Sequence, residues 1–461
     1  MAVEVAHRSR AATLRDERLH YVDQAMFLGL RATGQAAAMQ CVWIYEHPVD
    51  LDGVRRFHRN FGHGLWGRCI ERSSVPFGRH RWVRSVRPPA DIDVATEPRP
   101  RAELGVWLDE RAVLPVDPEW GPSWHLGVLS MTDGSTAVCL TMSHCISDGG
   151  GAVATMLDAI TGQIRDFGYP PPRSRTRGRA IAEDLRQSRH DFPEVARTLV
   201  SAGRIARARF RGRPRNSAPK QRADWKAFDD TRHVAVPTVS AFVDLEQWDL
   251  RAAALGGNTY SLLAAFCARL AHAMDRRATD GKVPLIIPIN DRIDDRDTRA
   301  NAVQLASVRI DPAEVCQDLS GARAEIRQTL ASLGDVPEDA EQLLPLIPFM
   351  PRKAVRRGAE MAFDFSENPV SCSNMGDVSA EISRLDGSDA EYVLMRGVDQ
   401  HVTRRVLEQR HGLLTIVSAR VGGRISLAVV GYAAGVPNTR AGLQECVERT
   451  LADFELTGVV V

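Results

Sequence analysis

The sequence has no apolar run long enough to cross a lipid bilayer. Its longest mostly apolar stretch, ISLAVVGYAAGV at 425–436, is well short of the ~20 residues that a transmembrane helix requires. The first segment, MAVEVAHRSRAATLRDERLH, is interrupted throughout by charged residues and therefore differs from a secretory signal. We expect a soluble, cytoplasmic protein without a cleaved signal and with at most peripheral contact with a membrane.

Closely spaced cysteines are also missing. The eight cysteines are scattered, and none forms the CxxC pair that is typical of zinc sites and redox dithiols. Scattered thiols fit a reducing cytoplasm, where disulfides are rare. The net charge of +1 gives no long-range attraction for anions or membranes. We therefore expect no metal site, and the lack of a nucleic-acid-binding motif argues against a nucleic-acid partner.

The composition that remains is that of a globular protein with a large core. The chain has 461 residues, of which 44% are hydrophobic and 25% are charged. Helical and extended periodicities alternate along it, which predicts an α/β fold. The expected helices are 13–30, one that begins after Asp50 or Asp52, 101–112, 152–164, 182–210, 258–274 and 439–455. The expected strands are 39–47, 125–131, 135–144, 283–290 and a pair within 413–432.

A basic stretch divides these patterns into two sets. Residues 173–222 contain 15 Arg or Lys against 4 Asp or Glu, with a helical pattern between the basic ends. We therefore predict an N-terminal lobe at 1–170, a basic connection at 171–226 and a C-terminal lobe at 227–461. The connection is either a solvated linker with a surface helix or a docking surface for an anionic partner. Such a partner would be the phosphates of coenzyme A, an acidic carrier protein or a lipid headgroup.

The stretch TMSHCISDGGGAV at 141–153 is the strongest candidate for a functional site. His144 lies at the end of a predicted strand, on the face that also carries Leu140 and Met142. Asp148 follows four residues later, and the three glycines after it allow a tight backbone path into a helix. No third ligand at metal spacing is nearby. On these residues alone, His144 is either a catalytic group or a satisfied polar residue at a strand end.

Six segments in order carry a resemblance to a known superfamily. They are DQAMFLGL (23–30), MQCVWIYEHPVDLDGVRRF (39–57), PVDPEWGPSWHLGVL (115–129), AVCLTMSHCISDGGGAVATML (137–157), NPVSCSNMGDV (368–378) and SARVGGRISLAVVGYAAGVPN (418–438). They resemble the superfamily of chloramphenicol acetyltransferase, peptide-synthetase condensation domains and plant acyltransferases, and in particular the bacterial wax ester synthase/diacylglycerol acyltransferases. In the hallmark motif HHxxxDG of this superfamily, Ser143 replaces the first histidine. The Asn-Asp pair of the wax ester synthases is replaced by Asn258-Thr259.

This resemblance implies two chloramphenicol-acetyltransferase-like lobes, each a mixed sheet flanked by helices, with an active-site tunnel between them. It implies that His144, the second histidine of the hallmark, takes the proton of the acceptor, a task that suits neutral imidazole. Asp148 would hold the loop through an arginine, for which Arg292 in PINDR is the candidate. Because a thioester is already activated, no cofactor is required.

The expected function is transfer of an acyl group from acyl-CoA to a hydroxyl acceptor, which forms an ester. Gly149 and Gly150 would allow close approach of the substrate, and Ser373 and Asn374 would line the tunnel and donate hydrogen bonds. Two alternatives stay open. One is a condensation-like enzyme of natural-product or lipid biosynthesis, which takes its acyl group from a carrier protein docked on the basic connection and forms an ester or amide. The other is a catalytically silent member of the fold.

Overall fold

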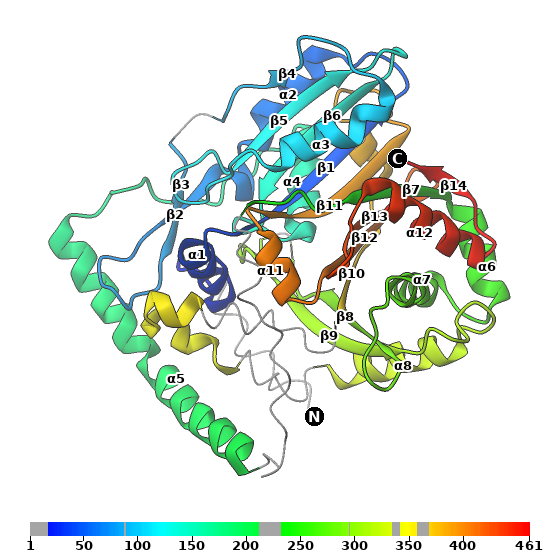
Figure 1. Cartoon of the computed structure of the whole chain (residues 1–461). Helices are drawn as coiled ribbons and strands as arrows, with labels where there is room; N and C mark the ends of the chain where they lie inside the picture. Colours follow the sequence, from blue (N-terminus) through cyan, green and yellow to red (C-terminus); the bar gives the residue numbers. More distant parts are fainter. Residues whose placement is uncertain (1–16, 87–88, 212–231, 295, 334–341, 357–367) are drawn as a thin grey trace.

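Two separate β-sheets, each with its own helices, form the body of the molecule (Figure 1). The computed structural model describes residues 17–86, 89–211, 232–294, 296–333, 342–356 and 368–461. Both sheets contain parallel and antiparallel pairs, so the expected α/β class with mixed sheets flanked by helices is confirmed. Within the ranges above, no helix is both long and apolar enough to span a membrane.

The first sheet has five strands in the order β11-β1-β6-β5-β4. The bounds are β1 (Ala36–Tyr45), β4 (Asp93–Val94), β5 (Trp124–Ser130), β6 (Thr136–Ser143) and β11 (Tyr392–Gln400). The helices that cover it are α2 (Leu51–Phe61) and α4 (Gly149–Thr161) on one face and α3 (Leu104–Ala112) on the other. Asp50 caps α2 by accepting from the amides of Asp52 and Gly53, as one of the two predicted cap positions requires.

Side-chain alternation along β6 sets the orientation of the residue that follows it. Leu140 and Met142 enter the core beneath α2 and α4, whereas Ala137 and Cys139 enter the core beneath α3. The predicted alternation is thus confirmed for the strand. Trp124 of β5 is buried in the same core as Leu140 and Met142, which is the packing role that its size favours.

The second sheet has seven strands in the order β14-β7-β13-β12-β10-β8-β9. The bounds are β7 (Thr238–Asp244), β8 (Val283–Asn290), β9 (Val303–Ile310), β10 (Val370–Asp377), β12 (Leu413–Val421), β13 (Arg424–Tyr432) and β14 (Gly458–Val460). Its helices are α6 (Leu245–Ala254), α7 (Thr259–Ala273), α8 (Ser320–Ser332) and α12 (Arg440–Asp453).

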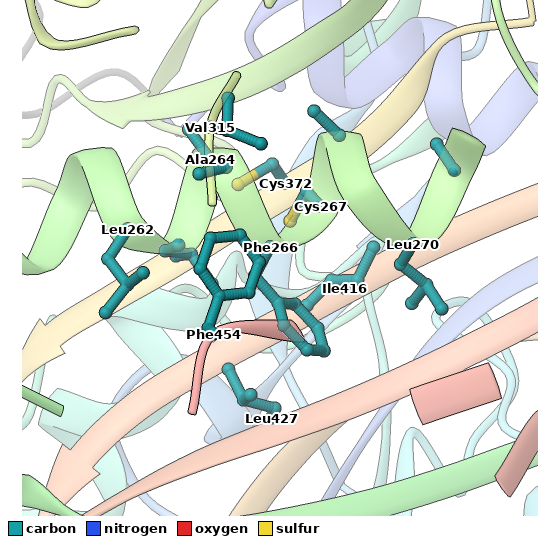
Figure 2. Close-up of a cluster of buried hydrophobic side chains, with 14 of the residues drawn as sticks. Leu262, Ala264, Phe266, Cys267, Leu270, Val315, Cys372, Ile416, Leu427 and Phe454 are labelled. Atoms are coloured by element: carbon teal, nitrogen blue, oxygen red, sulfur yellow. The ribbon is translucent and has the colours of Figure 1, made fainter. Parts of the chain in front are cut away.

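The helix α7 is the centre of the C-terminal core. Asn258 and Ser261 form a reciprocal capping box at its start, so the changed Asn-Thr pair begins a helix. The helix is apolar on nearly all sides and buried from Leu262 to Ala268. Phe266 packs there in one cluster with residues of β12, β13 and the C-terminal segment, including Phe454 (Figure 2). A helix with no polar face is stable only inside such a core.

The strand β11 corrects the predicted lobe boundaries. Its residues fall within the range predicted as the C-terminal lobe, yet they pair with β1 of the first sheet from Ala36↔Gln400 to Ile44↔Tyr392. β11 therefore fills the edge of β1 that β6 leaves unpaired, since an apolar edge strand is unstable in water. A strand from the C-terminal range therefore belongs to the N-terminal sheet, so a boundary at residue 226 does not divide the chain into two separate lobes.

The basic connection consists mainly of one long helix, α5 (Arg177–Arg211), which extends along the outside of the molecule (Figure 1). Residues 212–226 of the predicted connection lie outside the described residues. Asp184 anchors the helix, because its buried carboxylate binds the Ser74 amide, Arg18 and Arg175. The face turned away from this anchor is exposed to solvent, including Phe192.

The remaining elements are short. They are α1 (Tyr21–Thr33), η1 (Gly64–Gly67), β2 (Arg68–Glu71), β3 (Arg81–Arg84), η2 (Arg101–Glu103), η4 (Leu344–Phe349), η5 (Ala380–Ser383) and α11 (Arg404–Gln409). The helix predicted at 13–30 begins only at Tyr21, because Arg18 forms a bridge with Arg81 and holds the preceding chain extended. Residues 13–16 of that prediction lie outside the described residues.

Candidate active site

His144 lies immediately after β6, in the turn that leads to α4. Its amide donates to the carbonyl oxygen of Ala37 in β1 at 3.0 Å, which extends the β1–β6 ladder by one residue. The side chain is half-buried, and its Nδ1 is enclosed without a hydrogen-bond partner among the described residues. Nε2 is therefore the ring nitrogen that is open to solvent and available to a substrate.

Ala37, the neighbour of His144 in the sheet, is uncovered. It is the only exposed residue of β1, although β1 has a strand on either side. Ala37 belongs to the face of the sheet that carries Met39 and, across the β6 pairing, Met142 and His144. The sheet surface beside the imidazole is therefore open to solvent, while the next residues along the same face are buried.

Asp148 lies at the N-cap of α4, where its carboxylate is almost fully buried and fully bonded. Oδ1 accepts from the Gly151 amide at 2.8 Å, and Oδ2 accepts from the Ala302 amide at 2.8 Å. Arg292 Nη2 donates to both carboxylate oxygens at 2.9 Å. The structure thus brings together Asp148 and the arginine that the sequence singled out. All of these bonds direct the Asp148 carboxylate to the loop and to α4, and none of them involves the imidazole of His144. The geometry of Asp148 is therefore that of a residue that supports the loop.

A loop of the C-terminal lobe, residues 291–302, provides this support. Arg292 Nη1 also donates to the carbonyl oxygens of Asp297 and Arg299, at 2.7 and 3.0 Å. Burial opposes ionisation of Asp297, but hydrogen bonds from Arg299 hold the pKa of Asp297 below its usual value. The loop is therefore a network of charged hydrogen bonds that presents Arg292 in one orientation.

Asp23 is a supporting residue to which sequence reasoning gave no role. Its carboxylate is fully buried and accepts from the amides of Ala300 and Asn301, at 3.1 and 2.9 Å, and from Asn301 Nδ2 at 3.0 Å. It ties α1 to the loop that holds Asp148. The signal was present in DQAMFLGL, because an acidic residue on the buried side of a helix needs partners.

Gly149 and Gly150 open α4, and their amides make no hydrogen bond to the described residues. The two glycines differ in their surroundings. A Cβ on Gly149 would lie 2.9 Å from both Sδ and Cε of Met375, so this glycine allows close approach of β10. Gly150 is exposed, and a Cβ there would meet nothing closer than 3.6 Å. The amide of Gly150 can therefore face a ligand.

Ser373 and Asn374 lie near the end of β10 and point to opposite faces. The Asn374 carboxamide oxygen accepts from the Gly376 amide at 2.8 Å and from Ser418 Oγ at 3.3 Å, which gives it a structural role. Asn374 shares its face with Cys372 of the helix-covered core, so Ser373 projects from the other face and is partly exposed. The structure does not bring these two side chains together; Met375 is the β10 residue that reaches the motif.

Two adjacent cavities lie elsewhere in the molecule. Their volumes are about 470 and 420 Å³, and both are lined by His233, Val234 and Ala235, which pass between β11 and β13. Residues of β11 that include Asp399 also line the smaller cavity, whereas His144 lines neither. The tunnel expected at His144 therefore stays a prediction, supported by the exposure of Ala37.

The comparisons with known proteins agree on the architecture. No family model and no curated protein matches the sequence. The chain superposes on a wax ester synthase/diacylglycerol acyltransferase from Marinobacter aquaeolei VT8 with a TM-score of 0.55 and 14% identity, covering 95% of this chain and 98% of that one. The chain therefore has the fold of this acyltransferase structure.

Two further structures of this fold, an O-acetyltransferase and a condensation domain, are similar to the chain to about the same degree. The TRI3 trichothecene 15-O-acetyltransferase from Fusarium sporotrichioides gives a TM-score of 0.56 at 13% identity, over 94% of this chain and 93% of that one. The first condensation domain of the CDA synthetase gives 0.54 at 13% identity, over 96% and 100%. At such identities the likeness establishes the fold, and function has to be argued from the site.

Proposed function

We propose that the protein transfers an acyl group from a thioester, acyl-CoA, to a hydroxyl acceptor, with His144 as the general base. The observation that carries this proposal is the imidazole itself: Nδ1 is enclosed, Nε2 is open, and the sheet surface beside it is uncovered at Ala37. A histidine that served only to satisfy a strand end would have its nitrogens bonded.

The reaction is balanced by one proton that passes through His144. Nε2 takes the proton of the acceptor hydroxyl while the oxygen attacks the thioester carbonyl, which forms the C–O bond and a tetrahedral oxyanion. Collapse of this intermediate breaks the C–S bond, and the imidazolium returns the proton to the departing thiolate. The amide of Gly150, an exposed residue at the start of α4, is a candidate donor to the oxyanion, since helix N-termini favour negative charge.

Asp148 and Arg292 act as positioning residues in this proposal. They fix the turn that begins with His144 and ends at the first turn of α4, so the base and the Gly150 amide keep one relative position. Ser373 is the second candidate for contact with substrate, because it projects from the face of β10 opposite the helix-covered core.

A carrier-bound thioester is the second candidate donor. It is favoured by α5, which leaves Arg186, Arg197 and Arg204 exposed to solvent on the outside of the molecule. A phosphopantetheine arm and coenzyme A present the same thioester, so the chemistry at His144 would be unchanged, and a hydroxyl or an amine could serve as acceptor.

The test is a donor and acceptor screen with two variants. The wild type is incubated with acyl-CoAs or acyl-carrier proteins and cell extract, and acylated products are identified by mass spectrometry. His144→Ala should lower turnover by about 10²- to 10⁴-fold. Ser143→Ala, whose side chain belongs to the opposite face, should cost much less. Wild-type turnover in His144→Ala would contradict the proposal and favour a silent member of the fold.

A further inference from the structure

Asp399 lies in the same row of the first sheet as His144. In the register of β1 and β11, Asp399 is directly opposite Ala37, and on the other side Ala37 accepts the amide of His144. Residues that are directly opposed in an antiparallel pair project from the same face. The side chains of His144 and Asp399 therefore flank the methyl group of Ala37, with their backbones two strand spacings, or about 10 Å, apart.

The carboxylate of Asp399 stands apart from the charged groups that the structure describes. Among the described residues it makes no hydrogen bond and no ion pair within 4.0 Å. Arg410 favours its ionisation from a distance, but burial outweighs this effect and raises the pKa of Asp399. Arg410 itself donates to Gln35 Oε1 at 3.0 Å. A partly buried carboxylate without a hydrogen bond carries part of the cost of desolvation without compensation.

Two buried carboxylates near the site, by contrast, are fully bonded. Asp23 accepts three hydrogen bonds, and Asp148 binds two backbone amides and Arg292. Both hold the architecture of the loops. Asp399 makes no comparable bonds to the described residues, so its carboxylate is available to a ligand group.

The space between the two side chains is uncovered. Ala37 is exposed although it lies in the middle strand of the row, and both His144 and Asp399 are partly exposed. The row is thus an open slot with a base at one end, an acid at the other and a methyl group as its floor.

We propose that Asp399 binds a cationic group of the acceptor, which makes amino alcohols and related amines the preferred acceptor class. This inference rests on the proposed acyl transfer at His144. The acceptor would lie along the slot, with its nucleophilic oxygen at Nε2 of His144 and its ammonium group at the carboxylate of Asp399. A charged hydrogen bond here also removes the cost of the unpaired carboxylate, so acceptors without a cation are bound less well.

The experiment compares matched acceptors with octanoyl-CoA as donor. One series is ω-amino alcohols of increasing length, and the other is n-alkanols in which a methyl group replaces the ammonium. The wild type should prefer the amino alcohols, with an optimum length set by the slot. Asp399→Asn should raise KM for the best amino alcohol about 10- to 100-fold, with kcat little changed, as loss of a charged hydrogen bond predicts. Its kinetics with the matched alkanol should stay within about twofold.

Two further variants separate binding from folding. Asp399→Glu lengthens the side chain by one methylene, so the optimum amino alcohol should become shorter, which a purely structural role would not produce. Asp52→Asn, at an exposed carboxylate on α2, is the matched control and should change neither acceptor series. Thermal melts of each variant show whether the fold is retained.

The outcomes are distinguishable. An equal loss for both acceptor series in Asp399→Asn, or an unchanged optimum in Asp399→Glu, would overturn the assignment and make Asp399 a counter-ion of Arg410. Alkanol transfer that depends on His144 would still support the proposed function in that case. If the wild type transfers octanoyl to none of these acceptors and the broader screen is also negative, the proposed function fails, and this inference fails with it.

Discussion

Replacement of Asp148 by asparagine tests whether the motif aspartate supports the loop or takes part in the chemistry. In the folded protein its two oxygens accept from the amides of Gly151 and Ala302 and from Arg292. Asparagine has only one acceptor oxygen, so its NH2 group would face either an amide N–H or the guanidinium. The guanidinium would also lose its counter-charge at a site where both side chains are at most one-tenth exposed.

The expected cost is that of breaking a buried ion pair, about 3 to 5 kcal/mol. Urea unfolding followed by circular dichroism should show an earlier midpoint for Asp148→Asn, with activity reduced in parallel. The matched control is Asp52→Asn, which removes an exposed pair with Arg55 and should cost at most ~1 kcal/mol. A variant of native stability that is as inactive as His144→Ala would refute the reasoning and give Asp148 a direct chemical role.

Three other predictions concern the slot, the anchor of α5 and its exposed arginines. Ala37→Leu should suppress turnover and leave the melting temperature nearly unchanged. Ala38→Leu, at a buried position, should destabilise the fold by about 1 to 3 kcal/mol. Equal melting temperatures for these two variants would contradict the open slot. Burial opposes the ionisation of Asp184, but the Ser74 amide, Arg175 and Arg18 lower its pKa from 3.8 to about 2. The contribution of Asp184 to stability is therefore complete above pH ~4 and is lost as the pH falls toward ~2. Asp184→Asn should thus be less stable than the wild type at neutral pH and approach it in acid. Urea unfolding midpoints measured across this pH range check the prediction. Replacing Arg204 and Arg207 together by serine should raise KM for the donor and weaken the dependence of this KM on salt. The matched control, serine at Arg55 and Arg59, should change neither. Unchanged donor kinetics in the first variant would show that α5 is a solvated surface helix.

The local part of the site was predictable because its signals are close together in the chain. A strand that alternates up to Met142 directs His144 to the same face, and Asp148 before three glycines is placed to cap a helix. The helix of the C-terminal core was equally predictable, since an apolar segment behind Asn258 has no polar face. In each case one short segment contains the physical reason.

The non-local part could not be read from the sequence. Nothing in residues 392–400 indicates that they pair with β1 rather than with a neighbour in the chain, so the place of β11 in the first sheet was missed. The same holds for Asp23, whose partners lie nearly three hundred residues away in Asn301 and Ala300. Asp399 gave no signal, because its significance depends on the row that it shares with Ala37 and His144. Arg292 was identified only because the resemblance specified an arginine to look for.

The placement of β11 has a consequence for how the chain is made. The strand that completes the sheet of β1 is synthesised some 350 residues after β1 itself. At ~5 to 20 residues per second, β1 waits on the order of tens of seconds with one edge unpaired. During that time the nascent N-terminal half presents an apolar strand edge to other chains, to chaperones and to itself. The turn that carries His144 is therefore synthesised well before the strand that completes its sheet.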